Sequence, residues 1–477
     1  MSLEVKGVRR AALSFVSAAI ALSAVLCAPA AQAAGRVQLA KGGNYDPADG
    51  FIVGYRAGSA SRSNPARALQ SLQGIANRTF SRTANAPKLR RDRRLGTGAD
   101  LFKPDRRIDR AAADRIMSLM AQDPDVEYVE PNIRLYATYT PNDAYFSLQT
   151  NLGTGDNTYA TQAWDTGYRG QGKIIAIVDT GITDHPDLNA NVLAGGYDFI
   201  SDAFTANDGN GRDANPTDPG DWQDAGMCTA DPAARSSKWH GTHVAGIAAA
   251  VTNNGTGVAG MAFNAKILPV RALGRCGGSL ADVADAVTWA SGGTVSGVPG
   301  VGVNRANVIN MSLAGAGVCD ATMQNAINGA VARGVPVVVS AGNDNADAGG
   351  YVPANCANVI VVGTHNHIGS FYGEKESFSN YGFVVDLSAP GYMIASAGNT
   401  GTTTPVAAQY YYKSGTSMSA PHVAAVIAMM MSKPSADCAP AVCEQILKEN
   451  SDLFMGPPQY PLGWGRLNAL KAINATP

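Results

Sequence analysis

The sequence predicts an α/β protein with a doubly wound, mostly parallel sheet, preceded by a smaller α+β domain. In the later part of the chain, short apolar runs typical of buried parallel strands alternate with helical patterns. Such alternation places helices on both faces of one sheet and ligands outside the carboxyl ends of its strands. The predicted strands span 174–179, 266–272, 307–313, 335–340 and 359–363, and the predicted helices 240–251, 280–290, 321–334 and 417–432.

The segment Gly415–His422 places a serine at the start of the last predicted helix, ahead of the wholly apolar run Val423–Met429. Unpaired backbone N–H groups and the positive end of the helix dipole would stabilise an anion formed beside Ser417. A serine in this place could equally be a helix N-cap. A nucleophilic role requires a neighbouring base, because serine alone is a poor nucleophile.

Two other segments supply candidate partners for Ser417. Asp179 ends the apolar run Ile174–Val178, and an acid there is costly to bury unless it is paired. His240 opens a predicted helix of small residues. Taken singly, Asp179 could be a locally satisfied strand-end acid and His240 a structural histidine. Together, and in the order Asp, His, Ser, they indicate nucleophilic catalysis at one cleft.

The segments Asp179–Gly181, His240–His243 and Gly415–Met418 resemble the three signature blocks of the subtilisin (subtilase) family of secreted serine proteases. The resemblance covers about residues 139–472. In short sequence segments, such as Tyr139–Asp143 and Val251–Asn254, the resemblance is strongest toward thermitase-like members. It implies a subtilisin-like fold and hydrolysis of peptide bonds in protein and peptide substrates.

The resemblance also assigns a role to each site residue. Ser417 would attack the peptide carbonyl, His240 would move the proton, and Asp179 would orient the imidazole. Asn343, which follows the predicted strand 335–340, would donate its side-chain N–H to the oxyanion, with the Ser417 backbone N–H as second donor. A loop asparagine beside Gly342 could otherwise be a simple turn residue.

Two further segments resemble the backbone edges that hold an extended substrate in this family. Pairing with backbone gives affinity without demanding a substrate sequence. Ala314 stands where the family more usually has glycine, so the sequence does not predict the cleavage preference. The expected substrate-binding residues are Gly277, Gly278, Ser279, Ser312, Leu313, Ala314 and Gly342.

Residues 1–33 have the features of a secretion signal, with basic residues before an apolar stretch and Ala31-Gln32-Ala33 at its end. The stretch is too short and alanine-rich to predict a membrane anchor. We therefore expect a secreted, extracellular protein. Residues 34–138 resemble the subtilase propeptide, a small α+β, ferredoxin-like inhibitor and chaperone, and residues 139–477 would be the peptidase domain.

The predicted propeptide contains strand patterns at 51–55 and 125–132 and helical patterns at 66–75 and 108–120. Its basic run Lys88–Arg94 is expected to be a solvated loop. Residues 34–138 hold 18 Lys and Arg against 11 Asp and Glu, whereas residues 139–477 hold 16 against 26. These opposite charges should draw the propeptide and the peptidase domain together.

Six cysteines follow the predicted signal, and an even count in an exported protein predicts three disulfides. Six cysteines allow 15 pairings, and a metal cluster is the weaker alternative because no CxxC pair occurs. Nearest neighbours in sequence are the predicted pairs, namely Cys228 with Cys276, Cys319 with Cys356, and Cys438 with Cys443.

The glycine motif 255–260 follows a helix and leads into a strand, which is the wrong order for a dinucleotide site. By resemblance it belongs to a structural Ca²⁺ site, and no organic cofactor is expected. Its predicted ligands are the side chains of Asp143, Asp187 and Asn254 and the carbonyls of Val251, Thr256 and Val258. A second acidic stretch, with Asp202, Asp208, Asn210 and Asp213, could hold another ion or be a solvated loop.

Two functions other than proteolysis are alternatives for this sequence, namely a binding protein without activity and a zinc hydrolase. An inactive binding protein with this fold is disfavoured because the nucleophile, base, orienting acid and oxyanion donor are all present. A zinc hydrolase is disfavoured because His240 and His243 lack the spacing of a zincin pair. We expect a monomer with its own propeptide as inhibitor, and no nucleic-acid or membrane partner.

Overall fold

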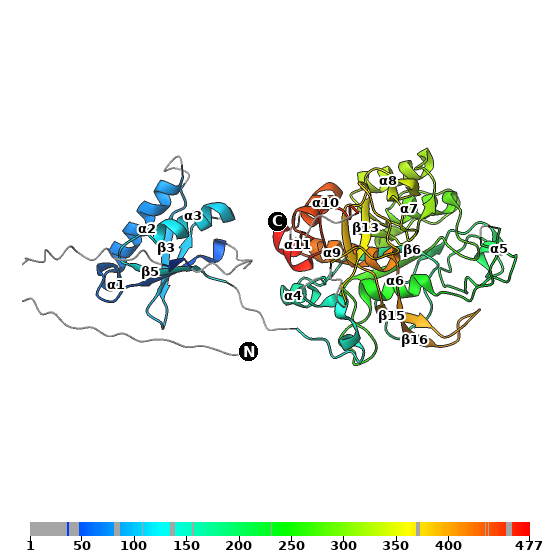
Figure 1. Ribbon diagram of the computed structural model, residues 1–477, viewed down its shortest axis with the longest axis horizontal. Helices are drawn as coiled ribbons and strands as arrows, with labels where there is room; N and C mark the ends of the chain where they lie inside the picture. The colour runs from blue at the N-terminus through cyan, green and yellow to red at the C-terminus, as the bar shows by residue number, and fades with distance from the viewer. Residues whose placement is uncertain are drawn as a thin grey trace, which may run out of the picture. The chain divides into compact units, whose positions relative to one another are not determined.

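The computed structural model describes residues 36–37, 47–80, 86–106, 108–133, 139–154, 157–229, 231–368, 373–434, 436, 438–454 and 460–477. The chain divides into two compact units, 1–134 and 135–477 (Figure 1). The predicted secretion signal, 1–33, and residues 134–138 at the predicted end of the propeptide lie outside the described residues.

The first unit is a five-stranded sheet with two helices packed on it. The strand order is β1-β5-β2-β4-β3, and the main elements follow one another as β-α-β-β-α-β, which is the ferredoxin-like order expected from the sequence. The core between helices and sheet includes Phe51, Leu72, Phe102, Ile116 and Val129. The elements are β1 (Arg36–Val37), β2 (Phe51–Tyr55), α1 (Ala60–Ser63), α2 (Pro65–Thr79), β3 (Leu89–Arg94), β4 (Asp100–Pro104), α3 (Arg110–Met120) and β5 (Val126–Pro131).

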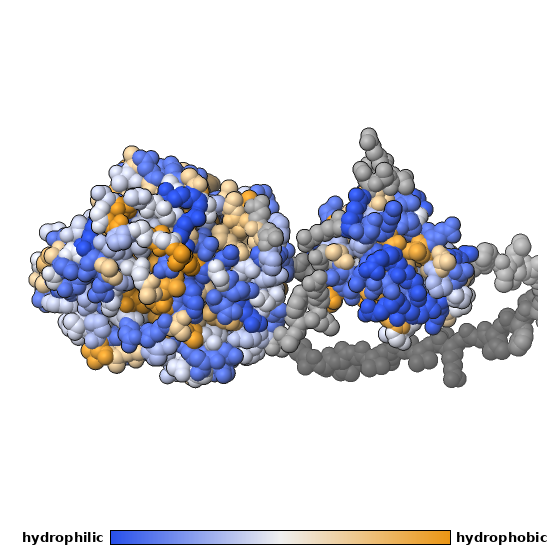
Figure 2. Space-filling model, turned by 180° about the vertical axis from the view of Figure 1, so that it is seen from behind, coloured by the Kyte–Doolittle hydropathy of each residue, from blue (hydrophilic) through white to orange (hydrophobic). Residues whose placement is uncertain are grey.

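The expectation of a solvated loop at Lys88–Arg94 is wrong, because most of this run forms the edge strand β3, paired antiparallel with β4. Buried Asp100 explains how an arginine-rich segment can be a strand. Its carboxylate accepts hydrogen bonds from Arg91 at 2.8 Å and Arg94 at 3.0 Å. Figure 2 shows the strongly hydrophilic face of this unit. Charged edge strands of this kind resist pairing with other chains.

The described residues of the second unit build a seven-stranded parallel sheet, so the predicted doubly wound fold is confirmed. The order β14-β13-β11-β9-β6-β8-β7 means that the chain leaves β6 in one direction for β8 and then returns to β9 on the other side. The carboxyl ends of β6 and β9 therefore lie side by side at a topological switch point. The strands are β6 (Ile174–Asp179), β7 (Tyr197–Asp198), β8 (Lys266–Arg271), β9 (Val308–Met311), β11 (Val337–Ser340), β13 (Ile360–His365) and β14 (Leu387–Pro390).

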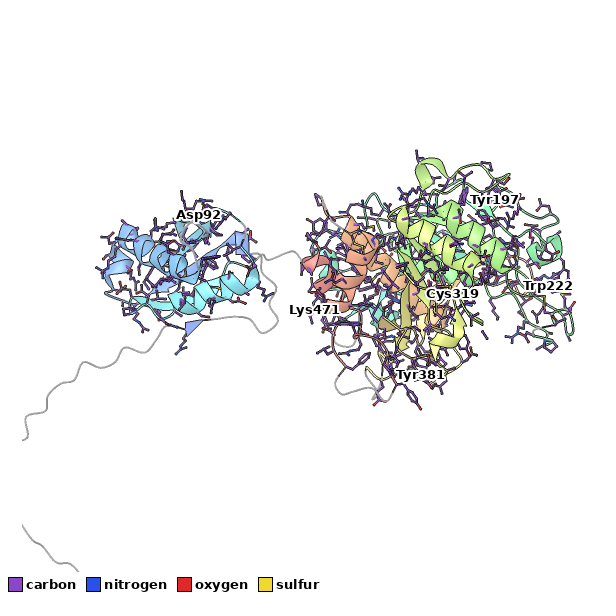
Figure 3. The ribbon with its side chains drawn as sticks, turned by 90° about the horizontal axis from the view of Figure 1, so that it is seen from above. Asp92, Tyr197, Trp222, Cys319, Tyr381 and Lys471 are labelled. Atoms are coloured by element: carbon purple, nitrogen blue, oxygen red, sulfur yellow. A yellow bond between two sulfur atoms is a disulfide. The ribbon has the colours of Figure 1, made fainter. Side chains whose placement is uncertain are left out.

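Helices cover both faces of this sheet (Figure 1). Alternate residues of β6 show the division, since Ile175 and Ile177 belong to the core beneath α6 and α9, whereas Ala176 and Val178 belong to the core beneath α7 and α8. Figure 3 labels Tyr197, which packs against Trp289 of α7 in this second core. The helices are α4 (Ala160–Asp165), α5 (Ala203–Ala206), α6 (His240–Ala249), α7 (Leu280–Ala290), α8 (Ala321–Ala332), α9 (Thr416–Met431), α10 (Pro440–Glu449) and α11 (Ala469–Ala475).

The sequence pattern did not predict the hairpin of β15 (Ile394–Asn399) and β16 (Ala408–Lys413), nor the short pair β10 (Gly315–Ala316) and β12 (Tyr351–Val352). In β16 every residue is exposed or half-buried, so no apolar alternation marks it as a strand. Its pairing with β15 decides its conformation instead. The hairpin matters because β16 ends four residues before Ser417.

Three disulfides are present among the described residues, and they are the nearest-neighbour pairs predicted from the sequence. Cys228–Cys276 ties the long loop after α5 to the loop after β8, with 5.4 Å between Cα atoms. Cys319–Cys356 joins the segments around β10 and β12. Cys438–Cys443 closes a short loop at the start of α10. In the part of the chain that the structure describes, no helix is long and apolar enough to cross a membrane.

Three buried histidines lie in and around the core next to α9. His365 ends β13, His367 follows it, and His422 lies on α9. Burial lowers the pKa of His365 to about 3 and the pKa values of His367 and His422 to about 4. His422 is held by the Asn151 amide and the Met418 carbonyl, at 2.8 Å each. All three rings are therefore neutral near pH 7.

We predict that His367→Phe reduces the acid sensitivity of folding. In the unfolded chain His367 gains a proton below about pH 6.5, whereas the folded form resists it until about pH 4. The free energy of unfolding should thus fall between these pH values, by at most about 3 kcal/mol from this residue. Urea unfolding of Ser417→Ala protein, with and without His367→Phe, measures the difference. If the free energy of unfolding depends on pH in the same way in both proteins, the prediction is wrong.

Candidate active site

The residues singled out from the sequence gather where the carboxyl ends of the parallel strands meet two helix starts. Asp179 is the last residue of β6, Ser312 follows β9, and Asn343 lies beyond β11. His240 is the first residue of α6, and Ser417 is the second residue of α9. The fold therefore brings together five residues that are spread over the sequence between positions 179 and 417.

Asp179 and His240 are directly paired. His240 Nδ1 lies 2.7 Å from Asp179 Oδ1, which also accepts a hydrogen bond from the Thr180 backbone N–H at 2.8 Å. Asp179 is fully buried, and its Oδ2 has no hydrogen-bond partner among the described residues. Such a carboxylate favours the tautomer with the proton on Nδ1, which leaves His240 Nε2 free to accept a proton.

A second buried acid, Asp218, is connected through Thr180 to the segments that carry Asp179 and His240. Thr180, directly after Asp179, donates its hydroxyl to Asp218 Oδ2 at 2.7 Å and accepts the Gly241 backbone N–H at 3.0 Å. Burial raises the pKa of Asp218 to about 7. Thr180 thus links Asp218 to Gly241, the residue that follows His240. Asp218 has no individual signal in the sequence beyond its place in an acidic stretch.

Ser417 is held by reciprocal bonds to Ser312. Ser417 Oγ donates to the Ser312 carbonyl at 3.1 Å, and Ser312 Oγ donates to the Ser417 carbonyl at 2.8 Å. No hydrogen bond joins Ser417 to His240 among the described residues. Both nevertheless line one cavity of about 300 Å³. Rotation about the Cα–Cβ bond of Ser417 is the movement that would turn its hydroxyl toward His240.

Asn343 lies at the same cavity with its side chain in a fixed orientation. Its Oδ1 accepts hydrogen bonds from the Thr416 backbone N–H at 2.8 Å and from Thr416 Oγ1 at 3.0 Å. The amide Nδ2 therefore remains as a donor beside Ser417. Gly342 has φ +103°, and a Cβ there would lie 2.3 Å from Asn380 Nδ2, so only glycine fits.

A larger cavity of about 620 Å³ adjoins this one and shares His240 and Lys238 with it. The predicted edge residues Gly277, Gly278, Ser312, Leu313 and Ala314 line it, together with apolar side chains from α7 and α8. Two predicted substrate-binding residues are not among its lining residues. Ser279 instead caps α7 by accepting the Asp282 N–H at 3.1 Å, and Gly342 is buried beneath Asn343.

The residues predicted to bind calcium also lie together. Asp187 is fully buried and accepts hydrogen bonds from Asn254 Nδ2 at 2.7 Å and the Val258 N–H at 2.9 Å. Asp143 accepts the Asn253 N–H with both oxygens. Burial raises the pKa of Asp187 to about 6, with the Asp143 charge adding to it, and burial raises the pKa of Asp143 as well.

These two buried carboxylates form no ion pair within the described structure, and carboxylate oxygens suit a hard divalent ion. Two acids fall short of the three acidic, histidine or cysteine side chains that would mark a metal site by themselves, so carbonyl oxygens would have to complete the ligand set. The two carboxylates fit Ca²⁺, whereas the Asn254 side chain does not present its oxygen to them. Asn254 presents its amide nitrogen to Asp187, while its Oδ1 accepts the Thr256 N–H at 2.8 Å. Val251 is tied to the same loop by donating its N–H to the Asp187 carbonyl at 2.7 Å.

The four residues named in the second acidic stretch make contacts within the protein. Asp202 caps α5 by accepting the Thr205 N–H at 2.9 Å, and Asp208 pairs with buried Arg271 at 3.0 Å. Asn210 donates to Asp213 at 2.9 Å. In the described part of the chain, no group of three or more acidic, histidine or cysteine side chains could hold a metal ion. The buried Arg271 network was not predicted, because nothing in its local sequence marks an arginine as buried.

A family model described as the subtilase family matches residues 170–465 of the chain. The chain belongs to the subtilase family. It is 49% identical over 468 residues to an extracellular protease of Xanthomonas campestris pv. campestris, covering 98% of this chain and 79% of that protein. Thermitase of Thermoactinomyces vulgaris is 39% identical over 339 residues, or 70% of this chain and 99% of thermitase.

A solved protease structure from Pseudoalteromonas arctica PAMC 21717 has the same fold, with a TM-score of 0.67 and 45% sequence identity. The match covers 71% of this chain and 99% of that structure. The subtilase is therefore a serine peptidase with a subtilisin-like fold. Two lysines to which the sequence assigned no role, Lys238 and Lys413, also line the cavity that holds Ser417.

Proposed function

We propose that this subtilase is a secreted serine endopeptidase that cleaves proteins through Asp179, His240 and Ser417 and an acyl-enzyme intermediate. The observation that carries the proposal is the buried Asp179–His240 hydrogen bond, at 2.7 Å, directed at a cavity that also contains Ser417 and Asn343. The extracellular protease named above supports secretion by analogy.

Each side chain has a defined task in the proposed reaction. His240 Nε2 takes the proton of Ser417 Oγ as that oxygen attacks the substrate carbonyl, and later returns it to the leaving amine. Asp179 holds the ring and stabilises the imidazolium. The Asn343 amide and the Ser417 backbone N–H, at the start of α9, would then stabilise the oxyanion.

The competing zinc hydrolase finds no support at the second histidine of the motif. His243 is fully buried, and its Nε2 lies 3.2 Å from the Tyr411 carbonyl. Burial also holds the pKa of His243 well below its usual range. A ring packed in this way cannot turn to share a metal with His240.

We predict that Ser417→Ala, His240→Ala and the double variant lose nearly the same activity. The groups act as a unit, and in subtilisin such losses are of the order of 10⁶-fold in turnover. The measurement is hydrolysis of a quenched peptide, with a serine-directed inhibitor expected to label Ser417 and a zinc chelator expected to have no effect. Additive losses in the double variant would argue against a shared mechanism.

The proposal includes synthesis as a zymogen. Residues 34–138 would act as an inhibitor and folding aid, with β5 leading toward a junction near Ala137–Tyr139. Support comes from the opposite charges of the two segments and from the separate compact unit that ends near this junction. Cleavage of the junction in the same chain would benefit from the high effective concentration of a tethered substrate.

We predict that Ser417→Ala protein, made in a protease-deficient host, accumulates with its propeptide attached. Its intact mass should match a chain from which only the signal has been removed, because self-cleavage requires the nucleophile. Wild-type protein from the same host is the control and should begin near Tyr139. A Ser417→Ala protein that also begins near Tyr139 would show that another protease performs maturation.

We also propose that the mature enzyme is a monomer stabilised by Ca²⁺ held by Asp143, Asp187, Asn254 and neighbouring carbonyls. The ion would neutralise two buried carboxylates that lack a cationic partner in the described structure. Asp187→Asn should therefore reduce the gain in unfolding temperature between chelator and about millimolar calcium, because only the folded state presents the site. Asp320→Asn, at the N-cap of α8, is the matched control. A wild-type unfolding temperature that does not change with calcium would refute the site.

A further inference from the structure

The cavity around Ser417 is lined by two lysines and by no carboxylate. Its lining residues, called here the lysine pocket, are Lys238, His240, Asn343, Lys413, Ser414, Gly415, Ser417 and Met418. The larger cavity, by contrast, contains Asp221 and Asp231 as well as basic residues. The two cavities share Lys238 and His240, which therefore stand at the boundary between them.

The position of the pocket assigns it to the leaving-group side of the substrate. The backbone edges at Gly277–Gly278 and Ser312–Ala314, which would pair with the acyl side, line the larger cavity. A peptide that lies there and presents its carbonyl to Ser417 must continue past the nucleophile. It then enters the space bounded by Ser414, Gly415 and Lys413.

Lys413 is fixed at this position by its surroundings. It ends β16, and its Nζ donates to the Lys238 carbonyl at 2.6 Å while lying 5.4 Å from the centre of the Tyr411 ring. Its other two N–H groups have no hydrogen-bond partner among the described residues. Burial lowers the pKa of Lys413 to about 8, so the side chain is charged at pH 7.

The charges of Asp221, Asp179 and Asp218 raise the pKa of Lys413 against the effect of burial, but none of these carboxylates contacts a lysine ammonium in the described structure. Asp221 accepts the backbone N–H of Lys238 at 2.7 Å, and Asp218 is bonded to Thr180. Asp179 is occupied by His240. Neither Lys238 nor Lys413 forms an ion pair within the described structure. Two ammonium groups at one small cavity favour a negatively charged occupant.

We propose that the lysine pocket is a subsite for a carboxylate on the leaving-group side of the scissile bond. This rests on the proposed peptidase reaction and adds a preference to it. The carboxylate can come from an Asp or Glu side chain just after the cleaved bond, or from the carboxyl terminus of a short substrate. Lys413 is the specificity-determining residue, with Lys238 in support.

The test uses quenched peptides that differ only after the cleaved bond, assayed at pH 7. One pair carries Glu or Gln as the first residue, both with an amidated end. In the second pair, Gln is the first residue after the bond, and the peptide ends at the second residue. One member has a free carboxyl terminus and the other an amidated one. Mass spectrometry of the products confirms the position of the cut.

We expect kcat/KM to favour the carboxylate member of at least one pair by about 3-fold to 10-fold, the size of a partly shielded charge pair. The pair that responds identifies the source of the carboxylate. Lys413→Gln should abolish most of the preference because it removes the positive charge, and Lys413→Arg should keep it. Lys471→Gln, on α11 and labelled in Figure 3, is the control and should leave the preference unchanged.

Equal rates within both pairs for the wild-type enzyme would overturn the proposal, even if no variant can be purified. A preference that survives in Lys413→Gln combined with Lys238→Gln would also overturn it. These outcomes differ from failure of the proposed reaction itself. In that case no peptide would be cleaved, and the serine-directed inhibitor would not label Ser417.

Discussion

The burial of α9 against the parallel sheet is the constraint on which the rest of the site depends. All residues from Thr416 to Met430 are buried, so the helix cannot move without opening the core. Its first turn carries Ser417, and the same turn fixes Asn343 through Thr416. A rigid core helix thus sets the positions of Ser417 and Asn343 together.

The loops at the carboxyl edge of the sheet complete this arrangement with short polar links. Ser417 and Ser312 are joined by two reciprocal hydrogen bonds, and Thr180 connects the segments that carry Asp179 and His240. These bonds cross between elements far apart in the chain. They therefore hold the site in register across elements that are distant in sequence.

Electrostatics divides the surroundings of the site in two. Behind His240 lie the buried acids Asp179 and Asp218, one of them with its pKa raised to about 7. In front of Ser417 lie two lysines. Farther away, Asp143 and Asp187 form a separate buried acidic pair suited to a divalent ion. The unit combines neutral buried histidines, buried acids and a basic pocket, so its stability and its specificity should respond to pH in different ways.

The sequence by itself determined the fold class, the three cysteine pairs and the positions from which Asp179, His240 and Ser417 come. It could do so because buried parallel strands are continuous apolar runs, and because the signature blocks are local in sequence. It failed at β3 and β16, where charged or exposed residues become strands only through pairing with a neighbour. Only the tertiary structure decided that Asp208 binds Arg271, that Ser279 caps a helix, and that Lys413 and Ser417 line one cavity. Those outcomes depend on contacts between distant segments, which no local pattern of residues specifies.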